Sequence, residues 1–303
     1  MSFVKVFAPA TSANLGPGFD SLGMAFNYGD TYTAQLSSQP GVRVTVTGDS
    51  GKDVPSDHTN LVAKTLLWTY DKVRAPRPAG IEITCENVIP HGRGLGSSSA
   101  ATVGGLLLAK GLLGLQGMEI SERQLLDFGV EIEGHPDNIA PCLLGGLVVA
   151  WMDRREPGAQ QLQWHENIEP LLLVPNFTLS TEHARSLQPD TVPLADACFN
   201  VSRAALLVAA LTHNPEHLLA ATEDRLHQDY RAGAMQASHQ LLVQLREKKF
   251  AAVVSGAGPS LLVLCKNTVE RQKASDFVAE QAADWQRLAL DIAPQGARLE
   301  VVA

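Results

Sequence analysis

The chain of 303 residues has few cysteines and no clustered histidines. Its cysteines, Cys85, Cys142, Cys198 and Cys265, lie far apart, and no pair has the CxxC spacing of a zinc site or a redox dithiol. We interpret them as small hydrophobic residues in a reducing compartment, which excludes a disulfide scaffold. The nine histidines form no HxH pattern, and their HxxxH pair, His213 and His217, is interrupted by Pro215, so the sequence does not support a histidine-ligated metal.

Basic residues and long apolar runs are also scarce. Lysine and arginine number 24 against 32 acidic residues, and the net charge is -8. Such a chain lacks the basic surface that displaces counterions from nucleic-acid phosphates, so we expect no nucleic-acid partner. The most apolar run, 103–115, is interrupted by Lys110 and by glycines, and it is too short to cross a bilayer. Because the N-terminal segment also lacks a signal-peptide core, we expect a cytoplasmic protein without a membrane partner.

The remaining composition is that of a globular protein. Hydrophobic residues make up 45% and charged residues 18%, which argues against disorder, and the length suits about two domains. Charges, glutamines, Pro157 and Gly158 gather at 152–163, which predicts domains of 1–155 and 156–303. The apolar patterns predict an α+β fold, with strands at 3–8, 32–36, 42–47, 81–84, 143–151, 171–174, 252–254, 261–265 and 298–302 and helices at 60–70, 100–115, 125–133, 195–211, 216–226, 240–247 and 269–285.

The most informative segment is PHGRGLGSSSA at 90–100. Gly92, Gly94 and Gly96 alternate with larger residues, and three serines follow at the start of a predicted helix. Glycines let the backbone approach an anion and present successive N–H groups, while the helix N-terminus adds unpaired donors and a partial positive charge. Serine hydroxyls bind phosphate or coordinate Mg²⁺. The segment therefore predicts a site for a diphosphate or triphosphate.

Two common phosphate motifs do not match this segment. No lysine follows the last glycine, which excludes the Walker pattern. The dinucleotide fingerprint is also excluded, because it requires a strand, a turn, a helix and an acidic residue about 20 positions later. The alternative that stays open is a glycine-rich turn whose serines cap the helix and bind no ligand.

The segment 90–101 resembles the phosphate-binding motif of the GHMP kinases, which include galactokinase, homoserine kinase, mevalonate kinase and phosphomevalonate kinase. Three further segments strengthen the resemblance. Residues 8–20, APATSANLGPGFD, are similar to the opening motif of homoserine kinases, and 133–141, EGHPDNIAP, resembles their substrate loop. Residues 255–260, SGAGPS, resemble the C-terminal glycine loop of the superfamily. The motifs occur in family order over about residues 4 to 265.

The resemblance implies a two-domain fold, with an N-terminal phosphate-loop domain and a C-terminal antiparallel sheet backed by helices, whose glycine loop lies near Gly94. It implies transfer of the γ-phosphoryl group of ATP to the hydroxyl of L-homoserine, with Mg²⁺ as cofactor. Ser98 and Glu131 are the expected metal ligands, although Asp127 and Glu133 leave the register open and Glu131 alternatively belongs to a solvated helix face. The expected nucleotide-binding residues are Pro90, His91, Gly92, Arg93, Gly94, Leu95, Gly96, Ser97, Ser98, Ser99, Ala100 and, toward the adenine, Asn60.

The resemblance places substrate groups at Asp137 and Asn138, which follow a proline in a predicted loop. A carboxylate there pairs with the substrate ammonium group, and an amide bonds its hydroxyl. Relatives that act on sugars and mevalonate have a basic aspartate at a comparable position, whereas this chain has Asn138, so we expect attack without strong base assistance. Thr181 is the second expected catalytic residue. The alternative for the pair is an Asx-turn with local backbone bonds only, and His135 is expected to shape the loop.

An amino-acid substrate also carries a carboxylate, which the planar fork of arginine binds well. Arg185 and Arg231 match family positions for this role, although Gln236 stands where the family has a proline. The alternative for either arginine is a surface ion pair, and for the opening loop it is shaping of the cavity without substrate contact. The expected substrate-binding residues are Asn14, Asp20, Asp137, Asn138, Arg185, Arg231 and Gly256.

Two other functions stay open at this point. One is a kinase of the same superfamily that acts on another small alcohol, and the other is a sensor that binds ATP and a metabolite without turnover. Exposed edge strands and the resemblance favour a homodimer.

Overall fold

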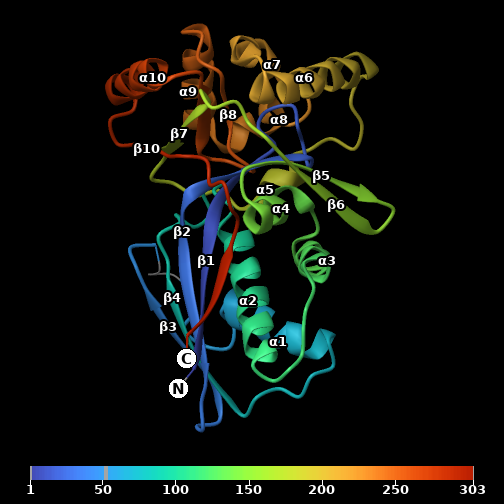
Figure 1. Cartoon of the computed structure of the whole chain (residues 1–303). Helices are drawn as coiled ribbons and strands as arrows, with labels where there is room; N and C mark the ends of the chain where they lie inside the picture. Colours follow the sequence, from blue (N-terminus) through green and yellow to red (C-terminus); the bar gives the residue numbers. More distant parts are fainter. Residues whose placement is uncertain (1, 51–53, 303) are drawn as a thin grey trace.

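The computed structural model describes residues 2–50 and 54–302 and has two sheets, each covered by helices. Figure 1 shows a long part that carries both termini and a smaller part above it, in which the sheet lies beneath orange and red helices. The predicted α+β fold in two parts is therefore confirmed. The antiparallel character of the second sheet and its helical backing are confirmed as well.

The first sheet has seven strands in the order β11-β1-β2-β4-β3, with β5 pairing both β2 and β6. All pairs are antiparallel except β3 and β4. β1 alternates buried and less buried residues up to Phe7 and is then buried throughout, because its second half lies beneath the second part of the molecule. The strands are β1 (Phe3–Ala13), β2 (Leu22–Leu36), β3 (Gly41–Thr47), β4 (Gly80–Glu86), β5 (Leu147–Asp153), β6 (Glu156–Leu162) and β11 (Arg298–Val302).

Helix α2 (Ser97–Gly114) lies at the centre of the long part, against β1 and β2. It is apolar on nearly every side, as expected of a helix enclosed by other elements. Gly104 permits this packing, because a Cβ there would overlap the ring of Tyr32. Three further helices surround α2, namely α1 (Leu61–Lys72), α3 (Glu122–Glu133) and α4 (Pro136–Leu144).

The second sheet has the order β10-β7-β9-β8. Its strands are β7 (Glu169–Val174), β8 (Ala252–Val254), β9 (Leu261–Cys265) and β10 (Gln286–Ala289). The helices of this part are α5 (Thr181–Ser186), α6 (Leu194–Thr212), α7 (Leu218–Ala221), α8 (Gln228–Arg231), α9 (Gln236–Glu247) and α10 (Thr268–Gln281), with 3-10 turns at Pro215–His217 and Ala232–Ala234. Among the described helices, α6 alone is long and apolar enough to cross a membrane by length and composition, and 22% of that stretch is buried.

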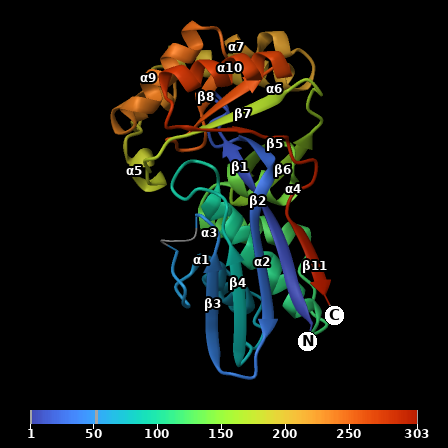
Figure 2. The ribbon, with the colours of Figure 1, turned by 90° about the vertical axis from the view of Figure 1, so that its left-hand side faces the viewer.

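The sheets do not divide at residue 155. The turn at 154–155 joins β5 to β6 within the first sheet, and β11 returns from the second part to pair with β1. Figure 2 shows β11 beside β1, with the two termini close together. The chain therefore enters the smaller part once and comes back, which no local composition signal shows.

Several local predictions were wrong. The strands expected at 3–8 and 32–36 are both longer, because β1 continues to Ala13 and β2 begins at Leu22. Residues 135–138 are no loop: Pro136 begins α4, where its fixed φ suits the first helical turn. The helix expected at 216–226 ends at Ala221, and the last helix ends at Gln281, before the additional strand β10. Of the cysteines, Cys198 is exposed on α6, while the other three are buried thiols.

Candidate active site

Two adjoining cavities lie where the two parts of the molecule meet. The larger measures about 1210 Å³ and is lined by the loop before α2, by the start of α1 and by residues 174–180. The smaller measures about 390 Å³. It lies between the opening loop, which is residues 14–21 between β1 and β2, the start of α4, α5 and the glycine loop at 256–257. Both are lined by Gly92, Ser97, Ser98, Leu179 and Ser180. A ligand in one cavity therefore reaches a ligand in the other across the N-terminus of α2.

The glycine-rich loop wraps the N-terminus of α2. Gly94 and Gly96 have φ of 72° and 69°, in the left-handed region that favours glycine. A Cβ at Gly94 would overlap the carbonyl of Ser255, and one at Gly96 would overlap the Thr11 hydroxyl. The first N–H groups of α2 have no partner within the helix, and no side chain caps them. This geometry is compatible with the predicted anion site.

The C-terminal glycine loop contacts the phosphate loop directly. The Ser255 hydroxyl donates its hydrogen to the carbonyl oxygen of Gly94 at 2.6 Å, and its oxygen accepts from the Ser12 hydroxyl at 2.8 Å. The backbone N–H of Gly256 donates to the carbonyl of Ala13 at 3.1 Å. The predicted proximity of this loop to Gly94 is confirmed.

The other residues of the loop divide into those that line a cavity and those that support the loop. Pro90 and His91 line the larger cavity. Ser99 is buried and lines the smaller cavity. Leu95 and Ala100 are also buried, and the carbonyl of Leu95 accepts from the backbone N–H of Thr11 at 3.0 Å.

Two of the expected nucleotide residues hold the protein itself together. The Arg93 guanidinium donates to the carbonyls of Pro175 and Asn176, at 2.9 and 3.1 Å, and so ties the loop to the second part. Asn60 lines the larger cavity, but its side chain caps α1 by accepting from Val62 and donates to Pro55. Both side-chain ends of Asn60 are therefore engaged in structural bonds.

The acidic residue beside the serines is Glu133 and not Glu131. The Ser98 hydroxyl donates to Oε1 of Glu133 at 2.6 Å, and Thr102 donates to the same oxygen at 3.2 Å. Glu131 instead binds Lys72 at 2.6 Å and its side chain is 52% exposed. Successive helical residues turn by about 100°, so two residues separated by two positions face nearly opposite sides of α3. The sequence had left Glu133 open as an alternative, and its place at the end of α3, separated by one residue from the HPDN segment, is the signal that favoured it.

Arg185, which lines the smaller cavity, forms an ion pair with Asp20. Nη2 of Arg185 lies 2.8 Å from Oδ1 of Asp20, and Nη1 lies 3.3 Å from Oδ2. Burial lowers the pKa of Arg185, but the hydrogen bond and charge of Asp20 outweigh this and raise it. The backbone of Asp20 is held by Asn14, whose Oδ1 accepts from it at 3.0 Å.

Asp137 and Asn138 lie in the first turn of α4. The Asp137 side chain is 2% exposed and its Oδ1 lies 2.5 Å from Nδ1 of His135. Burial lowers the pKa of His135, but the hydrogen bond and charge of Asp137 raise it by more, so the net shift is upward. Asn138 accepts from the Thr11 hydroxyl at 2.8 Å, and Thr181, the first residue of α5, lines the same cavity.

Arg231, the last residue of α8, lines the smaller cavity and is 1% exposed. Its Nη1 donates to the carbonyl of Gly256 at 3.3 Å, and Asn14 donates to the same carbonyl at 2.9 Å. Burial, and then the charge of Arg185, lower the pKa of Arg231 to about 10, so the guanidinium stays protonated at neutral pH. Every substrate residue that the resemblance named thus lines this cavity or, in the case of Asp20, contacts its lining.

The arrangement suits a small zwitterion beside a polyphosphate. The smaller cavity carries two guanidinium groups and two carboxylates, and the adjoining loop offers backbone N–H groups to an anion. A charged group buried in a protein needs such a partner, because desolvation of an unpaired charge is costly. The site can therefore hold a ligand with an ammonium and a carboxylate next to a phosphate chain.

Known proteins resemble the chain in sequence and in structure. Residues 60–146 match the family model of the GHMP kinases N terminal domain. The homoserine kinase of Clavibacter michiganensis is 52% identical over 300 residues, which cover 99% of this chain and 94% of that protein. The homoserine kinase of Leifsonia xyli is 50% identical over 302 residues, 99% of this chain and 93% of that protein. The crystal structure of homoserine kinase from Cytophaga hutchinsonii superposes with a TM-score of 0.85 at 28% identity and covers 98% of this chain and 97% of that chain. This chain belongs to the homoserine kinases of the GHMP kinase superfamily.

Proposed function

We propose that the protein transfers the γ-phosphoryl group of ATP to the side-chain hydroxyl of L-homoserine and forms O-phospho-L-homoserine, in the cytoplasmic synthesis of threonine. The observation that carries the proposal is the junction of the two cavities. A cavity with paired cations and anions opens onto the phosphate loop, so that an amino acid and a polyphosphate meet at the N-terminus of α2. Family membership points to the same reaction.

The nucleotide occupies the larger cavity, with its phosphates on the backbone of the glycine-rich loop. The expected metal ligand Glu131 is replaced by Glu133 in this proposal, because Glu133 shares a hydrogen bond with Ser98 at the cavity. Hydroxyl and carboxylate oxygens are the ligands that Mg²⁺ prefers, so the donor set fits the ion. When bound, Mg²⁺ neutralises phosphate charge, which phosphoryl transfer requires.

L-Homoserine occupies the smaller cavity. Its carboxylate pairs with the guanidinium groups of Arg185 and Arg231, and its ammonium group pairs with Asp137. Asp20 holds Arg185 when the substrate is absent, so binding exchanges one partner of this arginine for another. Asn14 and Gly256 fix the walls of the cavity through their mutual hydrogen bond.

The hydroxyl attacks the γ-phosphorus while the bond between the γ-phosphorus and the bridging oxygen of ADP breaks. Asn138 and Thr181 orient the hydroxyl. An amide is no proton acceptor at neutral pH, so the hydroxyl proton passes to an oxygen of the transferred phosphoryl group. Because such transfers have loose transition states, positioning and charge neutralisation contribute more than a base.

A coupled assay of ADP release tests the proposal with L-homoserine, L-threonine, L-serine and mevalonate in turn. We expect turnover with L-homoserine at a kcat/KM well above that with the other alcohols. Preference for mevalonate or another alcohol would favour a different kinase of the superfamily. Absence of turnover with all four, together with retained ATP binding, would favour a sensor.

A further inference from the structure

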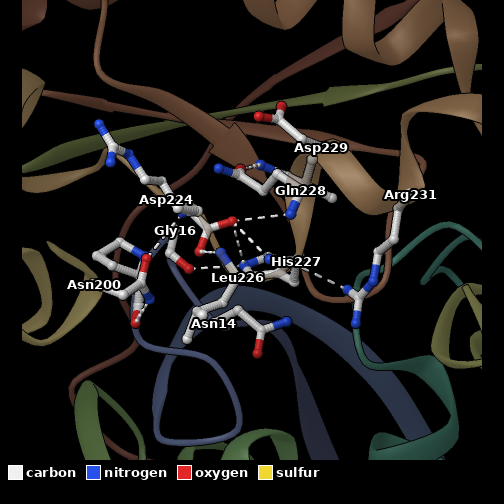
Figure 3. Close-up of polar contacts among 12 residues, drawn as sticks. Asn14, Gly16, Asn200, Asp224, Leu226, His227, Gln228, Asp229 and Arg231 are labelled. Atoms are coloured by element: carbon white, nitrogen blue, oxygen red, sulfur yellow. Dashed lines mark hydrogen bonds and ion pairs between the residues drawn. The ribbon is translucent and has the colours of Figure 1, made fainter. Parts of the chain in front are cut away.

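The segment before Arg231 is fastened to the opening loop by buried polar contacts (Figure 3). The Asp224 side chain is fully buried, and its carboxylate accepts backbone N–H groups from Leu226, His227 and Gln228 at 3.0, 3.0 and 2.9 Å. These bonds fix the chain that leads into α8. Asn200 of α6 also contacts the opening loop, because its side chain donates to the carbonyl of Pro17 at 3.0 Å.

His227 lies between this segment and the opening loop and is fully buried. Its Nε2 is 2.7 Å from the carbonyl oxygen of Gly16. A carbonyl only accepts, so Nε2 carries a hydrogen. Burial lowers the pKa of His227, although the charge of Asp224, 3.7 Å from Nε2, opposes this, and the neighbouring Arg231 lowers it further. The neutral ring therefore has a bare Nδ1, which is an acceptor.

That acceptor faces Arg231. Nδ1 of His227 lies 3.4 Å from Nη1 of the guanidinium, and Figure 3 shows the arginine extending from α8 past the imidazole. The ring of Phe19, from the opening loop, stacks on the imidazole with centroids 5.1 Å apart and an angle of 14° between the planes. The guanidinium lies over the same Phe19 ring at 5.3 Å. The imidazole orientation is thus set by stacking as well as by its hydrogen bonds.

The donors of Arg231 can be counted one by one. Nη1 has two acceptors, the Gly256 carbonyl and Nδ1 of His227. With its amide turned so that both ends are satisfied, Gln188 accepts from Nε at 3.0 Å and donates to Leu226 at 2.8 Å. Among the residues that the structure describes, none accepts from Nη2. Since Arg231 lines the smaller cavity, Nη2 is the edge left for a ligand.

We propose that His227 is a positioning residue for substrate binding: as the Nε2–H tautomer it holds the Gly16 carbonyl with one nitrogen and Nη1 of Arg231 with the other, which leaves Nη2 of Arg231 for the substrate carboxylate. The inference rests on the proposed function and deepens it. Histidine suits this task because its two ring nitrogens act as donor and acceptor at once and the ring is rigid.

Two substitutions separate the two bonds. In H227Q the amide nitrogen reaches about as far as Nε2 and keeps a donor for Gly16, but the acceptor for Arg231 is lost. In H227N the amide oxygen takes the place of Nδ1 and keeps the acceptor, while the donor for Gly16 is lost. H217Q, at an exposed histidine of the 3-10 turn after α6, is the matched control.

We expect H227Q to raise the KM for L-homoserine about tenfold, as the loss of one hydrogen bond beside a charge implies. The KM for ATP should stay within about twofold, H227N should lie closer to the parent, and H217Q should equal it. In an R231M background, H227Q should add less than about twofold. Equal effects of H227Q and H227N, equal rises in both KM values, or the full penalty in the R231M background would overturn the proposal.

A second measurement needs no variant. In the ¹⁵N spectrum of the histidine-labelled protein, the His227 ring should be neutral with hydrogen on Nε2, and its Nδ1 shift should change when L-homoserine is added. A protonated ring or the other tautomer would overturn the inference. If the parent turns over L-homoserine but these results fail, the positioning role is wrong and the kinase function stands. If the parent has no such turnover, the proposed function fails, and with it this inference.

Discussion

Replacing Glu133 by glutamine is the most direct test of the proposed magnesium site. The parent carboxylate accepts from Ser98 at 2.6 Å and from Ser99 and Thr102 at 3.2 Å. A glutamine preserves the size of the side chain and one accepting oxygen, but it removes the charge. A charge-assisted hydrogen bond contributes about 1.5–3 kcal/mol, and 1.4 kcal/mol corresponds to about a tenfold change. We therefore expect kcat/KM for MgATP to fall roughly 10- to 150-fold.

E131Q is the matched control, because it makes the same chemical change two residues away on the same helix. Glu131 pairs with Lys72 at the surface, with 52% and 37% of the two side chains exposed. Such pairs contribute about 0–1 kcal/mol to stability, so E131Q should lower the free energy of unfolding slightly and leave kinetics unchanged.

The assay measures initial rates while free Mg²⁺ is varied at fixed ATP, together with urea unfolding of each variant. E133Q should require more Mg²⁺ for half-maximal rate than the parent does, while E131Q should match the parent. The reasoning is refuted if E131Q lowers kcat/KM tenfold while a folded E133Q stays within twofold of the parent.

Three further predictions concern the substrate, the loop and pH. R185A should raise the KM for L-homoserine roughly 10- to 150-fold through loss of a charge-assisted bond, with the KM for ATP unchanged. The measurement is steady-state kinetics with each substrate varied in turn. A KM for L-homoserine and a KM for ATP that both stay within twofold of the parent would contradict this prediction. G96V should weaken both nucleotide binding and the fold, because its Cβ would overlap Thr11; a variant with parental unfolding midpoint and ATP affinity would disprove it. Asp137 raises the pKa of His135 against the effect of burial. The protonated pair is therefore fully stabilising below the unfolded pKa of about 6.5, and this contribution is lost as pH rises through the higher folded pKa. H135Q should flatten the fall in unfolding free energy over that window, and an unchanged urea-unfolding profile from pH 5.5 to 8.5 would contradict the assignment.

Most elements of the fold could be predicted from local pattern. The alternating apolar residues of β3 and β4 and the apolar run of α2 match the observed elements closely. The errors lie where tertiary contacts decide the backbone. β1 continues to Ala13 because its second half pairs with the start of β2, and α4 forms because Ile139 and Cys142 pack into the core. The contact of Cys142 with the Pro9 carbonyl, for example, joins residues that are 133 positions apart.

The site shows the same division. The glycine-rich loop was recognisable because glycine spacing and a following helix are local features, and the structure has left-handed glycines directly before the N-terminus of α2. The resemblance named arginines and carboxylates that the structure then brings to one cavity. The role of His227 could not be predicted from local pattern, because its contact with Gly16 joins residues that are 211 positions apart.

By itself, the sequence predicted most of the elements, a candidate anion site and the family of the chain, since each depends on residues close together along the chain. Only the tertiary structure decided that Glu133 and not Glu131 faces Ser98. Three acidic residues, Asp127, Glu131 and Glu133, lie along or at the end of one helix, and their spacing is compatible with more than one rotation of that helix. The packing of α3 against α2 selects one rotation, because burying the apolar side of α3 turns Glu131 to the solvent and Glu133 to the phosphate loop.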